Sequence, residues 1–305
     1  PPRHLGVQEL RWGIRALRVP ALRGATMGTQ MSETLGERWS QALSVPSDES
    51  LDLGLLAVLI AKAEYTDLDI EGTLAIFNDL AEEVMHAGGE VEDLRHVMFD
   101  KYQFRGNQDD YYTAANSYIN EVLRLRMGIP ITLCLVLMEV GARCNQALAP
   151  VSFPGHFLAR TQDAEGNFEF IDAFHGGAAQ DEATLVARLR QLTGRNDLPD
   201  AFVASAFTPC SRREVVARML RNLKQIYLQS RDWPRALRVT DQLVHVQPTQ
   251  GKHYRDRGQL YAQIGHTAAA QADLSQYLQI ATDRQEKERV RKLLIQLAGK
   301  RRPLN

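Results

Sequence analysis

Cysteine is scarce in this 305-residue sequence. The three cysteines, Cys134, Cys144 and Cys210, are far apart, and none belongs to a Cys-x-x-Cys pair. Three scattered cysteines do not make a disulfide framework, and a chain without Cys-x-x-Cys shows no zinc-site pattern. We therefore expect a protein of a reducing compartment, the cytoplasm, with no metal site and no cofactor.

Long apolar runs and excess charge are also missing. The longest apolar run, residues 129–138, has about half of the roughly 20 residues that a membrane span needs. The formal net charge is −1, which argues against nucleic acid and anionic lipid as partners. The chain carries no P-loop, no GxGxxG after a strand, no HExxH and no GxSxG. These absences favour a globular protein that binds neither nucleic acid nor membrane.

The N-terminus differs from the rest of the chain. It carries six arginine or histidine side chains before Met27 and a single acid, Glu9, without the uncharged apolar core of a secretory signal. We expect residues 1–30 to be disordered or an over-extended start, and they take no part in the fold prediction.

Apolar spacing predicts a series of helices before residue 145. The first covers 51–65 with Asp48 or Ser50 as its N-cap, and others follow near 70–87, 91–102 and 115–125. The stretch PITLCLVLMEVGARC then begins at Pro130, which suits a first helical turn because its missing N–H costs nothing there. Only Glu139 and Arg143 are charged in it. This pattern predicts a central helix covered on nearly all sides.

The period then changes to that of β-strands. FLART and NFEFID, separated by the turn residues 163–166, read as a β-hairpin. A loop centred near residue 164 would place His156 opposite Asp172 and Leu158 opposite Phe170. We therefore expect a His156–Asp172 pair at one end of an apolar strip. His175, before Gly176 and Gly177, is expected in a turn.

A repeat with a spacing of 34 residues begins near residue 211. Tyr227 matches Tyr261 and Ala236 matches Ala270, which is the period of tetratricopeptide helix pairs. A helix over 284–299, with Asp283 as N-cap, would end the array.

The inner helices of these repeats are rich in cations. Twelve cationic residues of these helices and the final helix outnumber the four acidic ones, Glu214, Asp256, Glu286 and Glu288. The twelve are Arg212, Arg213, Arg218, Arg221, Lys224, Lys252, Arg255, Arg257, Lys287, Arg289, Arg291 and Lys292. A groove with this imbalance would suit an acidic peptide or a C-terminal carboxylate. Arg221, Lys224, Arg255 and Arg257 are the candidate peptide-binding residues. The alternative is an ordinary solvated face.

Several motifs together resemble the bacterial SirB-one family. They are FRGN (104–107), NSY (116–118), GIPITL (128–133) and PGHFL (154–158), with IDAFHGG (171–177) and the repeats. The resemblance implies an α+β, mainly helical protein with two domains. A papain-like or transglutaminase-like core with a small antiparallel sheet would cover 31–208, and a C-terminal tetratricopeptide α-hairpin array would cover 211–300. It also implies a regulatory role.

The transglutaminase resemblance also assigns three positions. Its active members carry a cysteine two residues after a glycine, then a histidine and an aspartate on the following strands. Here Pro130 occupies the cysteine position, while His156 and Asp172 match the other two. Cys134 comes four residues later, on nearly the same helix face but about 6 Å further along.

Three functions remain open at this point. The first is a non-catalytic transglutaminase-like fold that regulates through protein–protein interaction, its His156–Asp172 pair keeping the former cleft in shape. The second is a cysteine-dependent amidohydrolase or acyl transferase that uses Cys134, His156 and Asp172. The third is a repeat scaffold that recruits an acidic partner.

Overall fold

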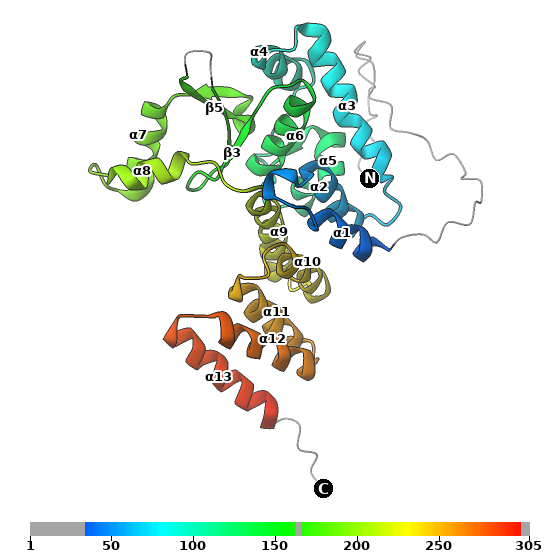
Figure 1. The fold of residues 1–305 in the computed structure, drawn as a ribbon, viewed down its shortest axis with the longest axis vertical. Coiled ribbons are helices and arrows are strands. Elements are labelled where there is room, and N and C mark those ends of the chain that lie inside the picture. Colours follow the sequence, from blue (N-terminus) through cyan, green and yellow to red (C-terminus); the bar gives the residue numbers. More distant parts are fainter. Residues whose placement is uncertain (1–33, 163–165, 300–305) are drawn as a thin grey trace, which may run out of the picture.

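The computed structural model describes residues 34–162 and 166–299. The expectation for residues 1–30 lies outside these ranges. A core of helices and a small sheet makes up one end of the molecule, and the C-terminal helices extend away from it (Figure 1). Within the described ranges, no helix is both long enough and apolar enough to cross a bilayer.

The helical part of the core surrounds one central helix, α6. Six α-helices and a short strand pair are the main elements of this part: α1 Leu35–Leu43, α2 Leu53–Lys62, α3 Ile70–Ala87, α4 Val91–Arg95, α5 Ile119–Leu125, α6 Pro130–Arg143, and the parallel strands β1 Arg105–Gly106 and β2 Met127–Gly128. The predicted 91–102 helix is present, but it ends in a π-helical turn, His96–Lys101.

Helix α6 is buried as predicted. Twelve consecutive residues, 130–141, are buried, and Pro130 is the first residue of the helix. Glu139 and Arg143 form an ion pair of 2.8 Å at its C-terminal end. The apolar sequence therefore reflects contact with neighbours on every side, and α2, α3, α4, α5 and the later helix α9 all pack on α6.

Helix α2 starts later than the prediction for residues 51–65. Its N-cap is Asp52, whose carboxylate accepts a hydrogen bond from the Leu55 N–H at 2.8 Å. The predicted caps, Asp48 and Ser50, lie in a separate 3-10 turn. Asp52 takes the role because it directly precedes the first turn, where a capping carboxylate reaches the free N–H groups.

The second part of the core is a four-stranded antiparallel sheet in the order β3-β4-β5-β6. The strands are β3 Ala149–Val151, β4 Leu158–Gln162, β5 Phe168–Asp172 and β6 Ala178–Gln180. The predicted hairpin is present as β4 and β5. The predicted register is wrong by two residues, because Phe170 pairs with Arg160 and not with Leu158. His156 therefore precedes the strand and lies in a turn. The shift of two keeps every side chain on its predicted face.

Helices α7 Glu182–Thr193 and α8 Asp200–Phe207 belong to a separate small hydrophobic cluster with the sheet. That cluster includes Val151, Leu158, Phe170, Leu185 and Phe207.

Four helices form the two predicted helix pairs, and a fifth ends the array. They are α9 Arg212–Gln229, α10 Trp233–Val246, α11 Gly251–Gln263, α12 Thr267–Ile280 and α13 Arg284–Gly299. Asp283 caps α13 as predicted, by accepting hydrogen bonds from the backbone of Gln285 and Glu286. The first helix, α9, is not separate from the core, because its apolar residues belong to the same hydrophobic cluster as α6.

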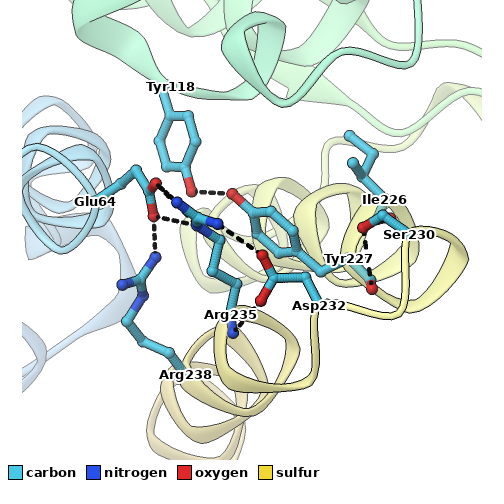
Figure 2. Close-up of polar contacts among 8 residues, drawn as sticks. All are labelled: Glu64, Tyr118, Ile226, Tyr227, Ser230, Asp232, Arg235 and Arg238. Carbon is cyan, nitrogen blue, oxygen red and sulfur yellow. Dashed lines mark hydrogen bonds and ion pairs between the residues drawn. The ribbon is translucent and has the colours of Figure 1, made fainter.

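Polar side chains at the junction reinforce this packing (Figure 2). The hydroxyl groups of Tyr118, before α5, and Tyr227, on α9, hydrogen-bond to each other, and both residues are buried. Glu64, just after α2, forms ion pairs with Arg235 and Arg238 of α10. The core and the first repeat are therefore joined by apolar, hydrogen-bonded and charged contacts together.

The tyrosine pair predicts a specific pattern of stabilities. Tyr227→Phe leaves the buried Tyr118 hydroxyl without its partner, which should cost about 1–3 kcal/mol of unfolding free energy. The double variant Tyr118→Phe/Tyr227→Phe should lose less than this single variant, because it leaves no polar group unpaired. Urea unfolding measures the two single variants, Tyr118→Phe and Tyr227→Phe, and the double variant, with the exposed Tyr112→Phe as a neutral control. Additive losses in the double variant would contradict the pairing.

Candidate active site

His156 is presented by a tight turn before β4. Gly155 has φ +70°, a conformation that glycine adopts without strain, and the His156 N–H donates to the Phe153 carbonyl at 2.9 Å. The imidazole Nε2 lies 2.8 Å from Asp172 Oδ1. The predicted meeting of His156 and Asp172 is confirmed, although the residues are not direct cross-strand partners.

Asp172 contacts both histidines of the site. It ends β5, and its carboxylate accepts hydrogen bonds from the backbone N–H groups of Phe174 and His175. Its second oxygen, Oδ2, lies 2.8 Å from Nδ1 of His175. Burial alone would raise the pKa of Asp172, but the hydrogen bonds and charges of His156 and His175 outweigh burial and lower it to about 2. Asp172 is therefore an ionised carboxylate held by two imidazoles.

Cys134 is fully buried in the second turn of α6. Its thiol has no exposed surface and lies 3.5 Å from the Phe157 carbonyl, to which it donates. Burial raises the pKa of Cys134 strongly, and the negative charge of Asp172 raises it further. A nucleophile must be a thiolate, so this environment opposes the role that the second function hypothesis gives to Cys134.

Pro130, at the position where the family resemblance places the nucleophile, is the first residue of α6 and is buried. Proline has no side-chain nucleophile. Pro130 therefore places no thiol at the helix start, where free N–H groups would lower a thiol pKa.

Arg218 is a site residue that the sequence analysis assigned elsewhere. From α9, its guanidinium donates to Ser152 Oγ at 2.5 Å and to the His156 carbonyl at 2.9 Å. It thereby holds both ends of the turn that carries His156. Burial lowers the pKa of Arg218, and the charge of Arg221 lowers it further.

Arg212 and Arg213 also differ from the prediction. Both reach backbone carbonyls of the core, Leu51 and Leu43 respectively. The first helix of the array packs on the core, so three of its cations face that contact and not an open groove.

The repeats do carry a groove, of about 750 Å³, between α9 and α11. Lys224 and Arg255 of the four predicted cations are among its lining residues, whereas Arg221 and Arg257 are not. All four have carboxylate partners: Arg221 pairs with Glu214, Lys224 with Asp256, Arg255 with Asp256 and Glu286, and Arg257 with Asp241 and Asp273.

Comparisons with known proteins agree with this architecture. A family model described as transglutaminase-like superfamily matches residues 57–221, and a tetratricopeptide-repeat model matches 223–295. The chain is 35% identical to a UPF0162 protein of Xylella fastidiosa over 85% of this chain and 95% of that protein. It is 25% identical to Protein SirB1 of Salmonella typhimurium, over 76% of this chain and 85% of that protein. It is also 34% identical to F-box only protein 21 of Mus musculus, over 44% of this chain and 21% of that protein. No solved structure matches significantly.

The burial of Cys134 predicts low thiol reactivity. In the native protein at pH 8, alkylation of Cys134 by iodoacetamide should be at least about a hundredfold slower than in urea, because reaction requires opening of the core. Peptide mass spectrometry follows each cysteine separately. Cys210, only partly buried, is the internal reference. Native labelling of Cys134 ahead of Cys210 would show that the thiol is accessible and activated.

Proposed function

We propose that this chain, which belongs to the transglutaminase-like superfamily together with the UPF0162 proteins and SirB1, is a non-catalytic regulatory protein of the cytoplasm. It acts through protein–protein interaction. The observation that carries the proposal is the absence of a nucleophile where the superfamily needs one: Pro130 starts α6, and the Cys134 thiol is sealed in the core.

The retained His156–Asp172 pair fits a structural role. The pair joins the turn before β4 to the end of β5, and Arg218 ties the same turn to α9. These contacts hold the sheet, the turn and the first repeat in a fixed arrangement. The superfamily resemblance of His156 and Asp172 is thus accounted for without a reaction.

The alternative, a cysteine-dependent amidohydrolase or acyl transferase, requires Cys134 to leave its place. The thiol would have to break its contact with Phe157, ionise and reach the imidazole of His156. Burial of twelve consecutive α6 residues opposes such a movement. This alternative is therefore not favoured.

An activity assay tests the proposal directly. Purified full-length protein, given peptide amides and glutamine peptides with a primary amine, should show no hydrolysis or transfer above the uncatalysed background. His156→Gln and Cys134→Ala should leave that background unchanged. Turnover that both substitutions abolish, in variants that circular dichroism shows to be folded, would establish the enzymatic alternative instead.

The repeat groove is the proposed contact surface for a partner. Two of the lining cations, Lys224 and Arg255, already pair with Asp256 and Glu286. Arg231 is the lining cation with no ion pair among the described residues, and its charge favours an acidic polypeptide. Leu228, 39% exposed, adds an apolar contact. The tetratricopeptide architecture supports protein binding, and the charge supports the acidic character of the partner.

Binding of acidic peptides to this groove should depend on Arg231. Arg231→Glu reverses a charge at an exposed lining position and should weaken binding of an acidic peptide by roughly fivefold, about 1 kcal/mol. Fluorescence anisotropy over a panel of acidic and neutral peptides measures the change. Arg195→Glu makes the same change in the loop after α7 and serves as the control. Equal effects of the two substitutions would show that the groove is not the binding surface.

A further inference from the structure

The site contains a second imidazole that the superfamily resemblance does not use. One potential metal-ligand atom from each of His156, Asp172 and His175 lies within 4.8 Å of those from the other two. We propose that these three side chains form a binding site for a divalent transition-metal ion, of which Zn²⁺ is the representative. The proposal does not depend on whether the chain is an enzyme.

The local fold fixes His175 beside Asp172. Residues Ala173–His175 form a 3-10 turn directly after β5, and Asp172 accepts hydrogen bonds from two backbone N–H groups of that turn. Gly177 then follows with φ +72°, and a Cβ there would lie 2.1 Å from the ring of Phe99. Close packing of the chain at Gly177 therefore limits how far the turn can move. His175 is positioned by the backbone as well as by its own hydrogen bond.

His156 reaches the same carboxylate from the other side of the hairpin. Its Nε2 lies 2.8 Å from Oδ1, while Nδ1 of His175 lies 2.8 Å from Oδ2. The ring centroids of the two histidines are 5.6 Å apart. Asp172 and His175 come from one turn, in the stretch IDAFHGG, and His156 joins them from the turn before β4.

The donor set suits a first-row transition metal. Imidazole and carboxylate are common Zn²⁺ ligands, at about 2.0–2.2 Å from the ion. In a neutral histidine, the proton that now lies on the nitrogen facing Asp172 would move to the other ring nitrogen. The facing nitrogen would then offer its lone pair to the metal. Small rotations of the three side chains would replace two hydrogen bonds by three coordination bonds.

The surroundings leave one side of the site accessible. The side chains of His156 and Asp172 are 4% and 3% exposed, whereas that of His175 is 49% exposed. An ion would enter beside His175, and solvent would supply further coordination there. Arg188 opposes a cation, since NH1 lies 3.9 Å from Asp172 Oδ2. Its side chain is 36% exposed, so the guanidinium has room to turn toward solvent.

The competing explanation is that Asp172 simply orients two histidines by hydrogen bonds. The two explanations differ in a measurable way, because a hydrogen-bonded cluster has no stoichiometric affinity for a metal. They also differ for His175, whose exposed ring is a ligand in one case and a minor surface contact in the other.

Metal titration of the full-length protein distinguishes them. Isothermal titration with Zn²⁺ should give one site per chain, and Co²⁺ substitution should produce the visible absorption of a low-symmetry nitrogen and oxygen site. His175→Ala should weaken Zn²⁺ binding by at least about tenfold. The matched control is His96→Ala, which removes an exposed histidine that also pairs with an aspartate, Asp100 at 3.1 Å. Among the described residues, His96 belongs to no such group of three potential ligands.

The outcome is decisive in either direction. Stoichiometric binding that His175→Ala impairs and His96→Ala preserves would support the site. Absence of stoichiometric binding, or equal binding by the native chain and His175→Ala, would overturn it. Because His175 is exposed, its removal should leave the protein folded, and circular dichroism of each variant verifies this.

Discussion

Burial of helix α6 is the constraint on which the rest of the molecule depends. The helix has neighbours on every side, and its only charged residues pair with each other at its C-terminal end. A thiol in such an environment is a packing group, because the free energy of ionising it rises with the loss of water. Cys134 therefore contributes to core packing, and Pro130 places no thiol at the start of the helix.

Two residues outside α6 connect this core to the rest of the fold. Asp172 joins the hairpin to the turn that follows it and receives hydrogen bonds from His156 and His175. Arg218 joins α9 to the turn that carries His156. Since α9 is also the first helix of the repeat array and lines the groove, the turn that carries His156 and the groove both contact this helix.

The sequence predicted the elements that depend on local pattern. Apolar periodicity located α6, the 34-residue repeat located α9–α12, and alternation located β4 and β5. It misplaced the features that depend on distant partners. The hairpin register was wrong by two residues because the loop near 163–166 gives no unique turn type, and the start of α2 was wrong because Asp52 competes with Asp48 for the cap.

The candidate site shows the same division. The meeting of His156 with Asp172 was predicted from strand alternation and is confirmed, but the turn before β4, not cross-strand pairing, brings the two side chains together. The role of Arg218 did not follow, because helical spacing placed it with the other repeat cations and gave no sign that α9 packs on the core. Arg255 pairs with the adjacent Asp256 and with Glu286 of α13, and Arg257 pairs with carboxylates of α10 and α12. Counting charges along the sequence therefore overstated the free positive charge of the repeats.

The central claim, that the thiol of Cys134 is a buried packing group, is tested most directly by its own titration. Ultraviolet absorbance of the thiolate, recorded against pH in a Cys144→Ser/Cys210→Ser variant, isolates this single group. The account predicts no thiolate signal between pH 5 and pH 9 while the protein remains folded. A titration with its midpoint below pH 8 would contradict it, since Cys134 would then form the thiolate that a nucleophile requires.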